Sequence, residues 1–409
     1  MILVRRVKEI GTHFRAGSSI GGAKAAFSPV VRSGPETPPV KERLYVRGDE
    51  FFIDLIRDIN SAVREILLET YIFELDAVGR AFIAALSHAH RRGVRVRLLV
   101  DGVGLPLAGG RLLAALEEAG FPFRIFHPIP WFFRHWRHMA GGRAAPSRFL
   151  QLLTRLNNRN HRKVCTIDRR IAWIGSFNLC ALHLPVAHGG EAWRDTAVRA
   201  ENVDTRPLEQ AFRRAWNPWR WRPLGYRTPP RSPFRLNDAR RQRRARMRDL
   251  LRRIGRSKRR IWITNAYFVP DERLLHEINR AAKRGVDVRI ILPSTSDIFF
   301  MPWTSAAFYG SLLDHGVKIY EYQPGVLHAK TIIVDDWMTV GSSNMNSRSL
   351  RHDLEIDYVL SQPGTKAALA SEFLKDLKRS DEISPSAYPN RPLWQRFLGH
   401  LVLFAKYWI

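Results

Sequence analysis

Cysteine is scarce in this sequence. The chain has 409 residues and only two cysteines, Cys165 and Cys180. Two cysteines cannot build a disulfide framework or a cysteine-rich zinc site, and free cysteine is usually a small buried side chain. We therefore expect both thiols to be buried and the protein to work in a reducing compartment.

Long apolar runs are also missing. No uncharged apolar stretch reaches the roughly 20 residues that a membrane-spanning helix needs. The first residues, MILVRRVKEIGTHFRAGSSIGG, lack the sustained apolar core of a signal peptide. The sequence therefore predicts a soluble or peripheral protein and not an integral membrane protein.

Acidic residues are few relative to basic ones. The sequence has 38 Asp and Glu against 66 Lys and Arg, which gives a formal net charge of +28. Such a surface favours polyanions, namely nucleic acid, anionic lipid headgroups or phosphorylated substrates. The hydrophobic content of 45% is that of globular proteins, and the length suggests more than one domain.

Two segments of the chain resemble each other. REILLETYIFELDAVGRAFIAALSHAHRRGVRVRLLVDG begins at Arg64, and RRIWITNAYFVPDERLLHEINRAAKRGVDVRIILPS begins at Arg259. Each pattern predicts a strand, a helix and a second strand, with Gly93 or Gly285 just after the helix. Short strand-helix-strand units predict parallel pairing with a right-handed crossover. We therefore expect a duplicated α/β chain.

Each half also contains one copy of a second motif. HRKVCTID begins at His161 and HAKTIIVD at His328, and each copy runs shortly into Gly-Ser and Asn. We interpret each as a strand entering a hairpin, with the Asp at the turn and the Gly-Ser at the end of the returning strand. We expect the two copies to meet and form one phosphate site. Its predicted residues are His161, Lys163, Asp168, Ser176 and Asn178 from the first half, and His328, Lys330, Asp335, Ser342 and Asn344 from the second.

This set of side chains suits phosphoryl transfer. Two lysines can neutralise phosphate oxygens, and the serines and asparagines can donate hydrogen bonds to them. One histidine can attack phosphorus while the other protonates the leaving alkoxide. Because the lysines supply the positive charge, we expect neither a metal ion nor another cofactor.

A histidine nucleophile works best when an acceptor fixes its other ring nitrogen. Two acids follow the Gly-Ser pairs at similar offsets. We predict that Asp195 orients His161 and that Glu355 orients His328. Glu191 and Asp353 are the alternatives.

These motifs resemble those of the phospholipase D superfamily, and most closely those of bacterial cardiolipin synthases. The resemblance rests on NHRKVCTIDRRIAWIGSFNL, AWRDTAVR, NAYFVPDERLL, YEYQPGVLHAKTIIVDDWMTVGSSNMNSRSL and LEIDYVL, and it covers about residues 44–375. It implies two similar α/β/α sandwich domains with mixed sheets and an active site at their pseudo-twofold interface. It also implies a covalent phosphohistidine intermediate without a metal, with His161 as the nucleophile and His328 as the general acid. The motif aspartates are structural in this family.

The second motif departs from the family pattern. Six residues separate Asp168 from Gly175, but only five separate Asp335 from Gly341. The shorter spacing predicts a tighter second hairpin. It leaves the role of Asp335 and the register of Ser342 open.

Composition suggests the following division of the chain. We expect a poorly ordered basic tail over 1–40, a first domain over 41–225 with an aromatic and basic insertion at 127–160, and a linker rich in Pro and Arg over 226–244. A second domain would follow over 245–380, and an amphipathic segment over 381–409.

Two stretches mix aromatic residues with cations. WFFRHWRH in the insertion and WQRFLGHLVLFAKYW near the C-terminus suit an interfacial membrane segment. The alternatives are packing on the protein's own core and stacking on single-stranded bases. The predicted membrane-binding residues are Trp131, Phe132, Phe133, Trp136, Trp394, Phe397, Leu401, Phe404 and Trp408.

Taken together, the resemblance and the composition predict a phosphatidyltransferase that joins two phosphatidylglycerol molecules into cardiolipin. Its partner would be an anionic phospholipid membrane containing phosphatidylglycerol and cardiolipin, with no nucleic acid. Its location would be peripheral, at the cytoplasmic face of the bacterial inner membrane. The alternatives are a phosphodiesterase or nuclease of the same fold, and an inactive basic scaffold.

Overall fold

The structure is a computed structural model that describes residues 38–105, 110–129, 137–139, 158–217 and 232–385. Most of the predicted basic tail and insertion, and most of the C-terminal segment, lie outside these residues. So do all nine predicted membrane-binding residues. Within the described residues, no helix is both long and apolar enough to cross a bilayer.

The first half of the chain forms a sheet in the order β1-β7-β6-β5-β2-β3-β4. Its strands are β1 (Lys41–Tyr45), β2 (Glu65–Thr70), β3 (Arg95–Asp101), β4 (Phe123–Phe126), β5 (Val164–Ile167), β6 (Ile171–Gly175) and β7 (Ala197–Glu201). The strands β2, β3 and β4 are parallel, and the others are antiparallel to their neighbours. The parallel pairing predicted for the first strand-helix-strand unit is thus confirmed for β2 and β3.

The second sheet has the order β8-β14-β13-β12-β9-β10-β11-β15. Its strands are β8 (Phe234–Leu236), β9 (Arg260–Thr264), β10 (Asp287–Pro293), β11 (Lys318–Tyr322), β12 (Thr331–Val334), β13 (Trp337–Gly341), β14 (Ile356–Val359) and β15 (Ser380–Glu382). Apart from β15, this order repeats the first sheet strand for strand. The predicted duplicated α/β fold with mixed sheets is confirmed.

Helices connect the strands at matching places in the two halves. The first half has α2 (Gly48–Ser61), α3 (Ala77–Arg91), α4 (Gly110–Glu118) and α6 (Arg206–Trp216), with single turns η2 (Ala181–His183) and η3 (Val186–His188). The second has α7 (Arg240–Arg256), α8 (Glu272–Lys283), α9 (Met301–Ala306), α10 (Tyr309–Leu313), α11 (Ser347–Arg351) and α12 (Pro363–Leu377). Gly93 and Gly285 follow α3 and α8 with φ of 88° and 86°, as the sequence predicts.

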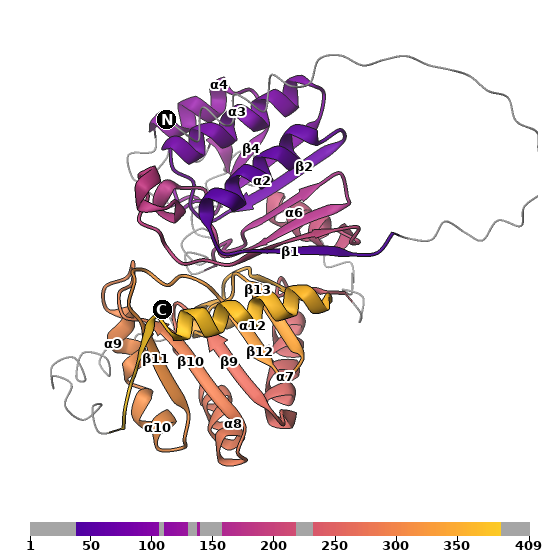
Figure 1. The fold of residues 1–409 in the computed structure, drawn as a ribbon. Helices are drawn as coiled ribbons and strands as arrows, with labels where there is room; N and C mark the ends of the chain where they lie inside the picture. The colour runs from indigo at the N-terminus through magenta and orange to yellow at the C-terminus, as the bar shows by residue number, and fades with distance from the viewer. Residues whose placement is uncertain (1–37, 106–109, 130–136, 140–157, 218–231, 386–409) are drawn as a thin grey trace, which may run out of the picture.

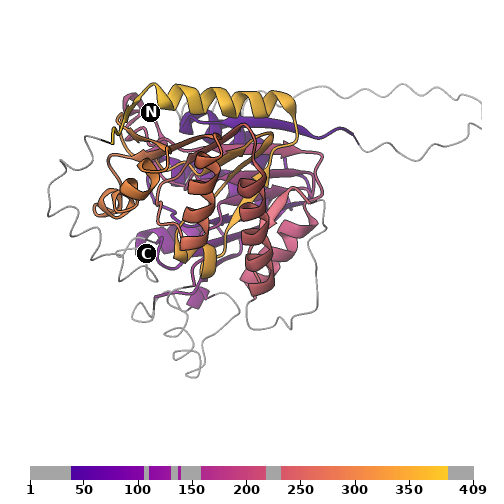
Figure 2. The same ribbon diagram turned by 90° about the horizontal axis from the view of Figure 1, so that it is seen from below.

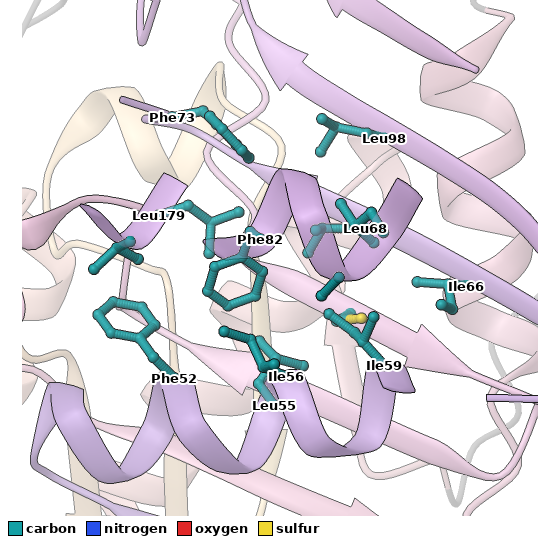
Figure 3. Close-up of a cluster of buried hydrophobic side chains, with 14 of the residues drawn as sticks. Phe52, Leu55, Ile56, Ile59, Ile66, Leu68, Phe73, Phe82, Leu98 and Leu179 are labelled. Carbon is teal, nitrogen blue, oxygen red and sulfur yellow. The ribbon is translucent and has the colours of Figure 1, made fainter. Parts of the chain in front are cut away.

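The two halves stack as layers (Figure 1). On the outer face of the first sheet, α2, α3 and α4 bury a large apolar core, part of which is shown in Figure 3. On the outer face of the second sheet lie α7, α8 and α10, which face the viewer in Figure 2. The inner faces of both sheets share a third apolar cluster with α12, so the halves are packed directly against each other. Both cysteines are buried and free, as expected.

The predicted linker is wrong in part. Residues 234–236 form β8, which pairs with β14, and α7 begins at Arg240. A strand of three residues gives no clear alternation, and α7 buries only Leu250 and Ile254 among many arginines. Its sequence therefore lacks the apolar stripe by which an amphipathic helix is recognised.

The two motif hairpins have the same register despite their different lengths. Three residues form the turn between Ile167 and Ile171, whereas two form the turn between Val334 and Trp337. At the other end, the backbone N–H of each Gly-Ser glycine donates to the motif lysine's carbonyl, at 3.3 Å and 3.2 Å. The extra residue is taken up at the tip, so Ser176 and Ser342 occupy equivalent positions.

The motif aspartates close these turns. The Asp168 carboxylate accepts the backbone N–H groups of residues 63, 64 and 65, and Asp335 accepts those of 258, 259 and 260, at 2.7–3.1 Å. Both aspartates have a left-handed φ of 52°, which Asp and Asn tolerate better than most residues. Burial alone raises the pKa of Asp335, but these backbone donors outweigh it and lower that pKa below its usual value. The tight second turn therefore retains the contacts of the first.

We expect Asp168→Ala and Asp335→Ala each to lower the free energy of unfolding by about 1–3 kcal/mol, because a charged acceptor of three N–H groups is lost. Asp168→Asn and Asp335→Asn should lose less, since Asn keeps one acceptor oxygen and tolerates the left-handed backbone. Guanidinium unfolding measures the effect. Asp336→Ala is the control, because that side chain is 79% exposed. Wild-type stability in both alanine variants would contradict the assignment.

Candidate active site

Main-chain contacts between the halves bring the two motifs together. The backbone N–H of His161 donates to the carbonyl of Leu354 at 3.0 Å, and that of His328 donates to the carbonyl of Arg194 at 2.8 Å. Each contact belongs to a short parallel bridge between a motif of one half and the other half. Leu354 and Arg194 directly precede the predicted orienting acids, so each acid is carried to the opposite histidine.

The orienting acids are therefore exchanged relative to the prediction. His161 Nδ1 lies 3.0 Å and 3.1 Å from the two carboxylate oxygens of Glu355, and His328 Nδ1 lies 2.8 Å from Asp195 Oδ1. The prediction that each acid serves the histidine of its own half is wrong. Sequence offset placed both acids correctly just before strands β7 and β14, but it carries no information about which half lies opposite.

The two alternative acids are bonded elsewhere. Glu191 accepts from the indole nitrogen of Trp193 at 2.9 Å, and Asp353 accepts from the backbone of Arg159 at 3.0 Å. Asp353 thus contributes to the contact between the halves. Neither geometry supports a role in orienting a histidine.

The two histidines are in different electrostatic environments. Burial, followed by the charges of Lys163 and Lys330, holds the pKa of His161 well below its usual value. Burial and Lys330 also lower the pKa of His328, but Asp195 opposes them. His161 is therefore neutral near pH 7, as a nucleophile must be, whereas His328 has an ionised partner that stabilises its protonated form.

The two acids differ in the same sense. Burial raises the pKa of Glu355 to about 7, against the opposing effect of Lys163 and of hydroxyl bonds from Ser342 and Ser349. Burial alone raises the pKa of Asp195, but His328 and His183 outweigh it and hold that pKa well below its usual range. The carboxylate beside His328 is thus the one that stays charged.

Both motif lysines are buried beside their histidines. Lys163 Nζ donates to the carbonyl of His161 at 3.0 Å, and Lys330 Nζ donates to the carbonyl of His328. Burial lowers the pKa of Lys163 to about 7 and that of Lys330 to about 8, and Lys330 further lowers the former. An ammonium has three donors and each of these bonds uses one. A bound anion would restore the full charge of both lysines.

The serines do not point where the sequence predicts. Ser176 donates to the carbonyl of Thr196 at 3.2 Å, and Ser342 donates to Glu355. Each hydroxyl also accepts a backbone N–H from the adjacent acid-bearing segment, at 3.1 Å. These contacts oppose the predicted phosphate role, and they tie each Gly-Ser to the segment that carries an orienting acid.

The asparagines differ from each other. Asn178 Oδ1 accepts the backbone N–H of Ile72 at 3.2 Å, which leaves its amide hydrogens as donors. Asn344 Oδ1 is buried without a hydrogen-bond partner in the described structure. Both residues are buried, and both follow the ends of their hairpins' returning strands at Gly175 and Gly341, which is where the sequence predicts those strands to end.

Two tyrosines were missed by the sequence reasoning. The Tyr71 ring lies 5.0 Å from the His161 ring and 5.0 Å from Lys163 Nζ. The Tyr267 ring lies 6.4 Å from His328 and 5.9 Å from Lys330 Nζ. Both follow the first strand of a repeated unit, in ETYIFELD and TNAYFVPD, and that repetition was the available signal. They form aromatic walls beside each His-Lys pair.

Comparison with known proteins gives consistent matches. The family model described as "Cardiolipin synthase, PLD-like domain" matches residues 55–216 and 250–377. Cardiolipin synthase B of Salmonella typhi is 33% identical over 370 residues, covering 86% of this chain and 84% of the relative. Cardiolipin synthase of Clostridium perfringens strain SM101 is 31% identical over 369 residues, covering 86% and 74%. That of Staphylococcus aureus strain Mu50 is 30% identical over 375 residues, covering 87% and 71%.

Solved structures share the fold at low sequence identity. A phosphatidylserine synthase of Haemophilus influenzae superposes with a TM-score of 0.63 at 14% identity, covering 90% of this chain and 95% of that one. A polyphosphate kinase of Porphyromonas gingivalis gives 0.57 at 15% identity, covering 89% and 52%. These likenesses concern the fold alone.

The lysine pKa values predict pH-dependent anion binding. Sulfate should bind best below pH 7 and weaken roughly tenfold per pH unit between pH ~7 and ~8 and roughly a hundredfold per unit above pH ~8, because each free lysine loses a proton that the anion requires. Calorimetric titration with sulfate between pH 6 and 9 measures this. Lys330→Met should weaken binding, while Lys375→Met, at an exposed position, should not. Affinity that is constant across this range would contradict the role of the lysines.

Proposed function

Because the chain belongs to the family of cardiolipin synthases with a phospholipase D-like domain, we propose that it joins two phosphatidylglycerol molecules into cardiolipin and releases glycerol. As a member of this family it is an enzyme of the phosphatidyltransferase type. The proposal rests on one observation. Each motif histidine is bonded to a carboxylate of the other half, and these two carboxylates differ in charge. No metal or other cofactor takes part in the proposed steps.

In the first step, His161 Nε2 attacks the phosphorus of one phosphatidylglycerol. The Nδ1–H of His161 remains hydrogen-bonded to Glu355, so the attacking nitrogen, Nε2, carries the lone pair. The bond from phosphorus to the glycerol headgroup breaks, and the His328 imidazolium gives its proton to the leaving oxygen. The products of this step are glycerol, neutral His328 and a phosphatidyl group on His161.

In the second step, a hydroxyl of another phosphatidylglycerol attacks the same phosphorus. Neutral His328 takes the hydroxyl proton, the bond between phosphorus and His161 breaks, and cardiolipin forms. Lys163 and Lys330 neutralise the phosphate oxygens throughout, assisted by the amide of Asn178. Asp168 and Asp335 serve only to hold the hairpins.

The assignment of the two roles is supported by the environment of each histidine. A nucleophile must be neutral, and His161 has the more strongly lowered pKa. A general acid must take up a proton more readily than the nucleophile, and the pKa of His328 is lowered less than that of His161 because the ionised carboxylate of Asp195 opposes burial. The same order of roles follows from the family resemblance.

Purified protein with phosphatidylglycerol vesicles and a chelator should form cardiolipin and glycerol in equal amounts. His161→Asn and His328→Asn should each lower the rate at least roughly 10³-fold, since histidines acting together in one transfer are not replaceable singly. His276→Asn, at an exposed position on α8, is the matched control. Thin-layer chromatography of labelled lipid gives the readout.

The alternatives are outcomes of the same experiment. Phosphatidic acid as the only product would mean hydrolysis and would sink the transferase proposal. Cleavage of DNA with lipid left intact would favour a nuclease. Acid-quenched protein should carry lipid label on His161, and label on His328 would reverse the two roles.

We further propose that the outer face of α7 attaches the protein peripherally to an anionic lipid surface, at the cytoplasmic face of the bacterial inner membrane. Six arginines on one side of this helix are exposed, whereas Leu250 and Ile254 on the opposite side are buried. The exposed arginines are Arg240, Arg241, Arg244, Arg248, Arg252 and Arg256.

The fold does not require this basic face. The helix at the same place in the first half, α2, exposes Glu50, Arg57 and Ser61 instead. The arginine face of α7 therefore matches an anionic partner, and each cation near an anionic bilayer contributes about 1 kcal/mol. Figure 2 shows α7 on the outer surface of the second half.

The triple variant Arg241→Gln, Arg244→Gln, Arg248→Gln should bind phosphatidylglycerol vesicles roughly 100-fold more weakly, with little change on phosphatidylcholine vesicles. Gln has nearly the helix propensity of Arg, so α7 should persist. The charge-matched control is Arg273→Gln, Lys283→Gln, Lys378→Gln, which removes exposed cations from α8 and from beside α12. Equal loss in the two triples, measured by vesicle sedimentation, would contradict a specific role of α7.

A further inference from the structure

The two orienting carboxylates have different second partners. The carboxylate of Glu355 is bonded by the hydroxyls of Ser342 and Ser349 as well as by its histidine. Asp195 instead lies between two imidazoles, with Oδ1 at 2.8 Å from His328 Nδ1 and Oδ2 at 2.8 Å from His183 Nδ1. Neither the side chain of Asp195 nor that of His183 is exposed. His183 belongs to none of the repeated motifs of the sequence.

The main chain fixes the tautomer of His183. Its Nε2 accepts the backbone N–H of Asn178 at 3.1 Å, so that nitrogen carries the lone pair. In the neutral ring the proton must then be on Nδ1, which faces Asp195. The rings of Phe177 and Trp193 pack edge-on at 5.3 Å and 5.7 Å and hold the imidazole in place.

We propose that His183 is a positioning residue, whose Nδ1–H holds Asp195 so that Asp195 in turn holds His328 for proton transfer. His183 does not touch the substrate and transfers no proton itself. Asp195 Oδ2 is a buried oxygen without a hydrogen bond in the described structure, and His183 Nδ1, at 2.8 Å, is the donor group placed to reach it. His183 also draws part of the carboxylate's charge away from His328, which keeps the proton of His328 easy to release. The inference rests on the proposed role of His328 as the acid.

The charged and titratable groups around this triad are on several elements. His183 is close to Asp195, Glu74 and His328. His328 also meets Lys330, Asp297 and the phenol of Tyr267, and its own charge lowers the pKa of His161. All of these residues are retained when His183 is replaced, and any effect on Glu74 is common to the His183 variants, so a difference between those variants reports on the donor to Asp195.

The direction of the shift follows from the charge balance. Deprotonating the Asp195–His328 pair leaves a bare buried carboxylate, and the donor from His183 stabilises that state most. Removing the donor therefore raises the pKa of the pair, which titrates as a unit. The alkaline limb of the kcat profile should move to higher pH, while kcat at the optimum falls because His328 is less firmly oriented.

Two amide variants separate the two ring nitrogens. His183→Asn can place an amide N–H where Nδ1 lies, and so keeps a donor to Asp195. His183→Gln extends its amide to where Nε2 lies, and so loses that donor while keeping a contact to the Asn178 backbone. We expect His183→Gln to lower kcat by roughly 10–100-fold with KM within about twofold, and to move the alkaline limb upward by roughly 0.5–1 pH unit. His183→Asn should retain the wild-type limb and most of kcat.

The cardiolipin-forming assay on vesicles between pH 5.5 and 9.5 supplies these profiles, with melting temperature as the measure of folding. An equal loss of kcat in His183→Asn and His183→Gln, with no shift of the alkaline limb in either, would mean that His183 has only a packing role. That result would overturn the proposal. Wild-type kinetics in His183→Gln would overturn it as well. If a variant unfolds, ¹⁵N-histidine NMR of the wild-type protein tests the inference in its place.

A readout independent of turnover separates this inference from the proposed function. ¹⁵N-histidine NMR of wild-type protein should show neutral His183 as the Nδ1–H tautomer, and the Nε2–H tautomer would overturn the inference. If wild type makes no cardiolipin but this tautomer is seen, the lipid substrate is wrong and the contact to Asp195 stands. If cardiolipin forms and the tautomer is Nε2–H, only the inference fails.

Discussion

The structure depends on the exchange of carboxylates between its halves. Each motif histidine is held by an acid from the other half, at 2.8–3.1 Å, and the backbone of each histidine is bonded to the residue before that acid. Buried charges of this kind are costly unless their partners are in place. The apolar cluster between the two sheets must therefore pack in one arrangement, because only that arrangement satisfies both acids.

Much of the fold could be predicted because it follows from patterns of residues that are close together in the sequence. The strand-helix-strand units, the glycines after α3 and α8 and the position of each aspartate at its hairpin turn all depend on residues close in sequence. The exchange of Asp195 and Glu355 could not, because offset along the chain does not tell which half lies opposite. His183 lies at the same offset from its Gly-Ser as Ser349 does in the second half, but the residue types differ, and so no repeated residue draws attention to it. The strand β8 and the arginine-rich α7 lack the apolar periodicity on which such predictions rest.

The hairpins show how the repeated frame tolerates divergence. Their tips differ by one residue, yet the glycine-to-lysine bonds at the site end are the same in both copies. The difference in length is thus confined to the end of the hairpin that is remote from the histidines. At that end the aspartate accepts three backbone N–H groups in both copies. Differences nearer the histidines are chemical: Glu with hydroxyl partners in one half, Asp with an imidazole partner in the other.

That inequality has a consequence for symmetry. A chain with one motif could assemble such a site only as a homodimer, in which both histidines would face the same acid with the same neighbours. The dyad axis would make the two imidazoles identical before substrate arrives. Fusing the halves into one polypeptide removes that axis, so Glu355 and Asp195 can diverge independently and the two histidines have unequal surroundings before any substrate binds.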